Sequence, residues 1–467
     1  MKPINLPDVS EAANYNALDP LDGRYYDPEI AKYLSEASRI AYQAYVEAAL
    51  AHGLAKFGVC SQEVADQIEE AAAKVTAEAV AKQEKTTKHD VKALVNCIKA
   101  ELPEAAQPYV HFGATSYDIV ATAMSLQLRA AVNEVVIPRL VELEKTLLRL
   151  TKDYADTVQI GRTHGQHAVP ITFGFAMAEY VSRLGGSINS LKVLSSKLKG
   201  KFSGAVGAYN ALSLFVDDPL EFEKTVLGYL DLEAAPYSTQ IIPAENYIRL
   251  IDELAVTAGI MANLGHDMRH LQRSEIAEVR EAFAPGQTGS STMAHKRNPW
   301  NFENVISMHK QVLAQVVNAN LNISSEHQRD LTDSASARFY PIVLASVASM
   351  AKRLDHVMGK LEVDEENMRR NLYMSGGAIA AEPLYLLLEK YGHTTAHEAS
   401  KTLAHQALEA GQPLYEVASR DSGIAGYFAK FTDGEKQILQ EPEKYYTGLA
   451  TQKAMTTHAY WQEQFNK

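Results

Sequence analysis

The sequence predicts an all-α protein in which long helices pack into a bundle. Apolar residues recur at three- and four-residue steps over long stretches, and alternating strand-like runs are scarce. Such stripes are typical of helices that pack along one face, and a monomer with many of them would expose apolar surface unless copies of the chain associate. The stripes are Val343, Val347, Met350, Leu354, Val357 and Leu361; Leu140, Leu143, Leu147 and Leu150; Ile251, Leu254, Ala258, Met261 and Met268; and Phe302, Val305, Val312 and Val316.

Composition is that of an ordinary soluble protein with a large core. Hydrophobic residues make up 46% of the 467 residues and charged residues 22%, and the net charge of −12 argues against a nucleic-acid partner. Cys60 and Cys97 are too few for a disulfide framework, which favours a reducing cytoplasm. The first ten residues lack the apolar centre of a signal peptide, and no apolar run is long enough for a membrane span.

Two breaks divide the chain into three predicted helical domains. A Pro- and Gly-containing stretch over 102–113 ends the first domain, and a second break over 373–377 precedes shorter helices. The predicted divisions are an N-terminal domain over 1–112, a central long-helix bundle over 113–364 that carries a loop at 286–299, and a C-terminal domain over 365–467.

The stretch from Gly289 to Pro299, within the loop at 286–299, has the composition of a catalytic loop. Glycine gives it backbone freedom, Ser290 and Ser291 supply hydroxyl groups, and Lys296 adds a positive charge. Asn298 and Pro299 are typical of a helix start, so these groups would lie just before the positive end of a helix dipole. The pattern therefore predicts a place that holds an anion.

Two histidine segments are further candidates. His164 lies between two glycines in a break between helical stretches, where an imidazole can act as a general acid. A histidine that only fills a turn is an equally good interpretation of this segment. His89 and Asp90 are adjacent, but neighbours on a helix point apart, so they are also consistent with plain surface charge.

The segment from Arg329 to Arg338 suits a phosphate. Its two arginines and Ser334 come near a predicted helix start, a combination that binds phosphate oxygens, although an Arg/Asp salt-bridge network on a solvated face is the alternative. His266 and His270 are spaced for a metal, but no third ligand lies near them in sequence, so we interpret them as structural and expect no metal site.

Taken together, these segments resemble the adenylosuccinate lyase family of the fumarase/aspartase superfamily. The superfamily signature matches Gly289-Ser290-Ser291-x-Met293-x-x-Lys296-x-Asn298-Pro299, with Ala294 where most members carry proline. The resemblance covers nearly the whole chain and is weakest after about residue 400. Further matching segments are Gly23-Arg24-Tyr25, His89-Asp90, His111 with Gly113-Ala114-Thr115-Ser116, Gly161 to Pro170, Ser203 to Gly207, Thr239-Gln240 and Arg329 to Arg338.

The resemblance implies β-elimination of fumarate from adenylosuccinate, giving AMP, and from the succinylated aminoimidazole carboxamide ribotide of purine synthesis, with no metal or organic cofactor. It implies Ser290 as general base, with Lys296 lowering the pKa of its hydroxyl group. It implies His164 as general acid, with Glu303 keeping that histidine protonated and His89 assisting. The substrate-binding residues that it implies are Lys296 and Asn298 for the reacting carboxylate; Thr115 and Ser116 for the other carboxylate; Gln240 for the succinyl group; Asp90; and Arg24, Tyr25, Arg329, Ser334 and Arg338 as a phosphate clamp.

The resemblance also implies a homotetramer whose central helices form a twenty-helix core, with each active site shared between subunits. Argininosuccinate lyase, aspartase, fumarase and the carboxymuconate cycloisomerases share the Gly-Ser-Ser loop, but the arginine segments make sense for a nucleotide. A non-catalytic structural homologue is the remaining alternative, and retention of Ser290, Lys296, His164 and Glu303 argues against it.

Overall fold

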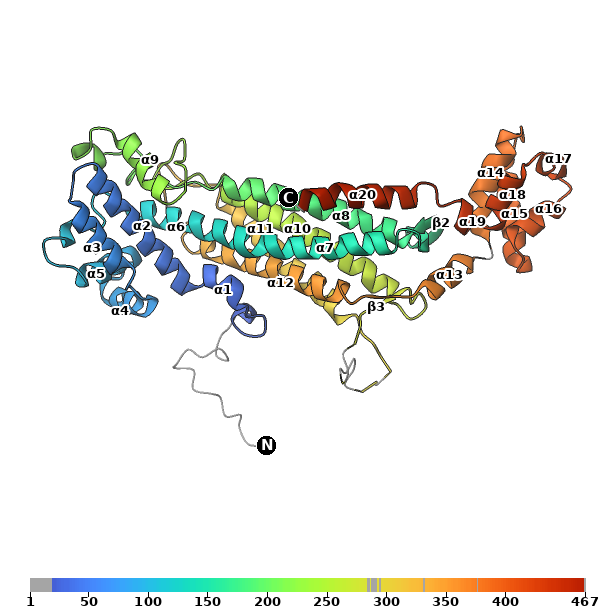
Figure 1. Cartoon of the computed structure of the whole chain (residues 1–467), viewed down its shortest axis with the longest axis horizontal. Helices are drawn as coiled ribbons and strands as arrows, with labels where there is room; N and C mark the ends of the chain where they lie inside the picture. The colour runs from blue at the N-terminus through green and yellow to red at the C-terminus, as the bar shows by residue number, and fades with distance from the viewer. Residues whose placement is uncertain are drawn as a thin grey trace. The chain divides into compact units, whose positions relative to one another are not determined.

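A computed structural model describes residues 19–283, 286, 292–293, 295–330, 332–375 and 377–465. As predicted, the described chain is built mainly of helices, with little strand (Figure 1). It divides into two compact units, and each is made of three stretches of sequence. Unit 1 comprises Met1–Leu140, Ser187–Gly259 and Ser307–Lys352, and unit 2 comprises Val141–Gly186, Ile260–Ile306 and Arg353–Lys467. The division into three sequence-continuous domains stays a prediction.

Long helices carry the apolar stripes. The four predicted stripes lie along α7 (Ile137–Asp153), α10 (Glu245–Leu271), α11 (Trp300–Leu321) and α12 (Tyr340–Met358), with Leu361 just after the end of α12, and α8 (Phe173–Ser196) is a further long helix. Every residue of the four predicted stripes is buried within the chain except Val316, which is half-buried. The expectation that these stripes need a second chain to cover them is therefore wrong. Other apolar side chains on α11 are exposed instead: Leu313, Val317 and Leu321.

Unit 1 gathers shorter helices around two apolar cores. One core joins α2 (Glu36–Lys56), α3 (Gln62–Ala72), α4 (Ala77–Thr87) and α5 (Asp90–Ala100), which lie together in Figure 1. The other joins α2 to α6 (Ser116–Ala131) and α9 (Pro219–Tyr229). The remaining elements are α1 (Pro28–Leu34), the π-helical turn η4 (Val132–Val136) and the 3-10 turns η2 (Pro20–Asp22), η3 (Gln107–Tyr109), η5 (Leu212–Leu214) and η6 (Ser336–Phe339).

Unit 2 contains two small antiparallel sheets, which the scarcity of alternating runs did not predict. β1 (Val158–Thr163) pairs with β2 (Gln166–Thr172), and β3 (Val279–Arg280) pairs with β4 (Glu362–Val363). The later helices form their own core, visible as the orange and red cluster of Figure 1. The helices of this part are α13 (Glu365–Tyr373), η7 (Ala378–Ala380), α14 (Ala381–Lys390), α15 (Ala396–Ala410), α16 (Leu414–Arg420), α17 (Ala425–Phe428), α18 (Asp433–Gln440), α19 (Pro442–Tyr445) and α20 (Ala450–Phe465).

Within the described part of the chain, no helix is both long and apolar enough to cross a bilayer. The same residues contain no cluster of three or more histidine, cysteine or acidic side chains placed to hold a metal ion.

Glu144, on α7, is a buried carboxyl without a described partner. It is fully buried, and neither of its side-chain oxygens has a hydrogen-bond partner among the described residues. Desolvation raises its pKa well above the ordinary value of 4.5, so burial favours the neutral form of the group.

We expect Glu144→Met to stabilise the protein, increasingly so at higher pH. Above pH 4.5 the carboxyl ionises in the unfolded chain but stays protonated in the folded one, so the wild type loses stability as pH rises until the folded pKa is reached. The gain near neutral pH should be about 1–3 kcal/mol. Thermal melts of both proteins between about pH 5 and about pH 8 measure it, and a constant difference across that range would contradict the neutral carboxyl.

Candidate active site

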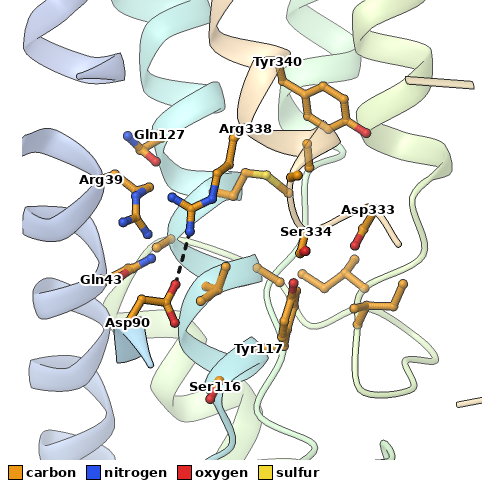
Figure 2. Close-up of a pocket in the computed structure, with 18 of the residues that line it drawn as sticks. Arg39, Gln43, Asp90, Ser116, Tyr117, Gln127, Asp333, Ser334, Arg338 and Tyr340 are labelled. Atoms are coloured by element: carbon orange, nitrogen blue, oxygen red, sulfur yellow. Dashed lines mark hydrogen bonds and ion pairs between the residues drawn. The ribbon is translucent and has the colours of Figure 1, made fainter. Parts of the chain in front are cut away.

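A cavity of about 690 Å³ in unit 1 brings together seven of the residues singled out from the sequence (Figure 2). Its walls come from the end of α1, from α2, from the junction of α4 and α5, from α6 as far as Leu128, from the loop before α10, and from residues 333–341, which lead into α12. The seven are His89, Asp90, Thr115, Ser116, Gln240, Ser334 and Arg338.

The α4–α5 junction presents His89 and Asp90 to the cavity. Lys88 ends α4 in the left-handed conformation, with φ of 56°, which turns the chain sharply. His89 then caps α5, with its Nδ1 accepting from the Lys92 N–H at 3.3 Å, so the neutral ring carries its proton on Nε2. Asp90 follows and accepts from Arg338 Nη2 at 3.3 Å. The histidine ring, 52% exposed, is therefore oriented by the backbone and open to a ligand.

Thr115 and Ser116 lie at the amino end of α6. The Thr115 N–H donates to Asp118 Oδ2 at 2.8 Å, an interaction of the capping-box type. Asp118 is 1% exposed and forms an ion pair with Lys201, whose side chain is fully buried. Because a helix amino terminus attracts negative charge, the two hydroxyl residues face a region suited to a carboxylate.

The Ser203–Gly207 segment, which had no evident role in the sequence, packs against Asp118. Gly204 N–H donates to Asp118 Oδ1 at 3.2 Å, and Lys201 donates to the Gly204 carbonyl at 3.3 Å. Gly207 has φ of 85°, and a β-carbon there would lie 2.1 Å from the Ser238 carbonyl oxygen. Only glycine therefore permits this approach.

The same scaffold reaches Gln240. Ser203 and Ser238 share a hydrogen bond of 2.7 Å between their hydroxyl oxygens, and two residues later the Gln240 N–H donates to the Gln328 carbonyl at 3.1 Å. These hydrogen bonds link α6 to the Ser203–Gly207 segment, that segment to Ser238, and Gln240 to Gln328, the residue before Arg329.

Three residues expected to bind phosphate do not line this cavity. Arg24 is exposed and Tyr25 half-buried, both in the loop that follows η2. Arg329 has a side chain only 3% exposed; it forms two hydrogen bonds to Asp333, one of 3.0 Å, and lies 4.7 Å above the Tyr117 ring. Its buried Nε has no hydrogen-bond partner among the described residues.

His164 belongs to unit 2, at the tip of the β1–β2 hairpin. His164 and Gly165 have φ of 52° and 73°, the signature of a two-residue type I′ turn, and both are exposed. Below the tip, Arg162 donates to both oxygens of the fully buried Glu278 at 2.5 and 3.1 Å. The hairpin therefore holds His164 on a rigid base, which the sequence did not indicate.

The signature helix α11 begins at Trp300, one residue after the predicted start. The buried carboxylate of Glu281 accepts from the N–H groups of Asn301 and Phe302 at 3.0 and 3.1 Å. This end of the helix dipole, predicted to be available for an external anion, is therefore occupied by the chain's own carboxylate. The Gln272 side chain links Glu281 to the segment before the helix: it accepts from the Glu281 N–H and donates to the Arg297 carbonyl.

The remaining predicted residues flank this helix start. Lys296 is exposed, Asn298 is half-buried, and Glu303 is exposed in the first turn of α11. Ser290 lies outside the described residues.

Comparison with known proteins identifies the family. A family model described as "Lyase" matches residues 24–314, and one described as "Adenylosuccinate lyase C-terminal" matches residues 325–421. The adenylosuccinate lyase of Pyrococcus abyssi is 38% identical over 92% of this chain and 95% of its own, and that of Methanocaldococcus jannaschii is 34% identical over 96% and 97%. An N-acetyl-S-(2-succino)cysteine lyase of Enterococcus italicus is 31% identical over 95% and 96%.

Solved structures agree with the fold. A 3-carboxy-cis,cis-muconate lactonizing enzyme from Pseudomonas putida superposes with a TM-score of 0.85, at 27% identity, over 96% of this chain and all of the other. Fold and sequence matches together define a lyase of the fumarase/aspartase superfamily. Within it, the chain belongs to the adenylosuccinate lyase family.

The buried ion pair under α6 provides a test of this scaffold. Lys201→Met leaves Asp118 buried without its counter-ion, so we expect a loss of about 3–5 kcal/mol of stability, read as a lower melting temperature. Lys199→Met is the matched control, because its partner Glu233 is exposed and its loss should change the melting temperature little. Equal melting temperatures for the two variants would contradict a supporting role of Lys201.

Proposed function

We propose that this protein is an adenylosuccinate lyase, which eliminates fumarate from adenylosuccinate to give AMP and acts likewise on the succinylated aminoimidazole carboxamide ribotide. The observation that carries the proposal is the polarity of the cavity: hydroxyl groups at a helix amino terminus line one part, and Ser334 with Arg338 lines another. This pairing suits a ligand with carboxylates at one end and a phosphate at the other. A cavity of about 690 Å³ is also within the usual size range for small-molecule sites.

The reaction makes three chemical demands. A base must remove a weakly acidic proton beside a carboxylate, the resulting dianion must be stabilised, and the leaving nitrogen must be protonated. We assign the first to Ser290, with Lys296 and Asn298 holding the reacting carboxylate and favouring the alkoxide form of the serine.

The third demand falls to His164, which a hairpin turn holds exposed to solvent and accessible to a leaving group. Glu303 would favour the imidazolium form, and His89, whose Nε2 proton is available, assists on the substrate side. Thr115, Ser116 and Gln240 position the succinyl group, and Asp90 and the clamp residues Arg24, Tyr25, Ser334 and Arg338 bind the nucleotide. Arg329 supports this clamp through its pair with Asp333, which lines the cavity. No metal or organic cofactor enters this assignment.

We further propose that the active protein is a cytoplasmic homotetramer, with a twenty-helix core and with active sites shared between subunits. Support comes from α11, where Leu313, Val317 and Leu321 are 46%, 63% and 72% exposed at a spacing that puts them on one face. The net charge of −12 supports a small-molecule rather than a nucleic-acid partner.

The activity is tested by following the purine absorbance of adenylosuccinate with purified wild type and Ser290→Ala. We expect turnover by the wild type and a loss of at least about 100-fold in kcat for the variant, with substrate binding retained, because only the base is removed. No spectral change with wild type would refute the proposal. Argininosuccinate and N-acetyl-S-(2-succino)cysteine, assayed in parallel, would then identify another substrate, and inactivity on both would favour a non-catalytic homologue.

Shared active sites predict complementation. His164→Ala and Ser290→Ala are each expected to be nearly inactive, but co-refolding them should restore part of the activity, because some sites in mixed tetramers combine two intact subunits. Mixed tetramers that form but stay inactive would show that both residues come from one chain.

A further inference from the structure

Four charged side chains alternate in sign at one end of the cavity. Arg39, on α2, donates to Glu36 through Nε at 2.8 Å and Nη2 at 2.5 Å, while Arg338 donates to Asp90 at 3.3 Å. Figure 2 shows Arg39, Asp90 and Arg338 extending toward one another. The two pairs also act on each other: Asp90 contributes to raising the pKa of Arg39 against the effect of burial, and Arg338 contributes to lowering the pKa of Glu36.

A phosphate dianion requires more positive charge than one arginine supplies. Arg338 lines the cavity and is 53% exposed, but Arg329 is nearly occluded and already neutralised by Asp333. Among the described residues that line the cavity, the arginines are Arg39 and Arg338. Neither the signature motif nor the arginine segment includes Arg39.

We propose that Arg39 is a further substrate-binding residue, the second guanidinium that with Arg338 holds the phosphate of the nucleotide. The inference rests on the proposed function. Its chemistry is available: the bonds to Glu36 use Nε and Nη2, so Nη1 carries donors that this ion pair does not use.

Glu36 is a weak competitor for this arginine. Its side chain is 62% exposed, whereas the Arg39 side chain is 18% exposed, so Glu36 can turn into water when a phosphate arrives. Asp90 likewise holds Arg338 through a single long bond. The carboxylates thus hold both guanidinium groups in place without closing the site.

The test measures binding rather than turnover, with AMP and adenosine as probes in calorimetric titrations. Arg39→Gln should weaken AMP binding by about 10- to 100-fold and leave adenosine binding unchanged, because a charge-assisted bond to phosphate is lost. Arg39→Lys keeps the positive charge but loses the paired N–H donors of the guanidinium group, so its effect should be smaller than that of Arg39→Gln. It also serves as the second variant should Arg39→Gln fold poorly.

Lys224→Gln is the matched control, since Lys224 and Glu221 form a surface pair of the same spacing on α9, away from the cavity. It should bind both probes like the wild type. An unchanged AMP affinity in Arg39→Gln, or equal losses for AMP and adenosine, would overturn the role of Arg39. Wild type that binds neither probe would instead overturn the proposed function, so the two failures are distinguishable.

Discussion

The buried ion pair between Asp118 and Lys201 is the interaction on which the cavity depends. Both side chains are essentially inaccessible to solvent, and a buried charge is tolerated only when it is paired and hydrogen-bonded. Asp118 satisfies this by binding Lys201, the Thr115 N–H and the Gly204 N–H together. Two segments far apart in sequence, the start of α6 and residues 201–204, are thereby held in one geometry, which also fixes the position of the hydroxyl groups of Thr115 and Ser116.

The sequence predicted the helical class and the stripes well, because both depend on local periodicity. It also indicated seven of the residues that line the cavity, of which Thr115, Ser116 and Gln240 followed only from the family resemblance. It could not indicate Lys201 or Glu281, because each acts on a partner many positions away in sequence, and no fixed sequence spacing predicts such a contact. The His164 hairpin was missed because β1 does not alternate buried and exposed side chains: two adjacent residues, Gln159 and Ile160, are both buried.

Arg329 and Arg338 show that a phosphate site cannot be predicted from the presence of arginines alone, because the burial of each arginine also matters. Arg329 and Arg338 lie in one sequence segment and looked equivalent, yet one is stacked on Tyr117 and bound twice to Asp333, while the other stands in the cavity. The alternative to a phosphate site was that the arginines of this segment form ion pairs with its aspartates. Arg329 does so with Asp333. A basic motif therefore predicts charge near a site, but the distribution of acidic neighbours decides which cation faces the ligand.

Glu281 raises a similar question about the signature segment. A buried carboxylate at the start of α11 fills the electrostatic role that an anionic substrate would have filled. Burial raises its pKa despite the hydrogen bonds that favour ionisation, which indicates how strongly it is desolvated. Because the dipole end is already satisfied, positive charge for a reacting carboxylate must come from a side chain. In the proposed mechanism that charge is supplied by Lys296, which is exposed four residues before the helix.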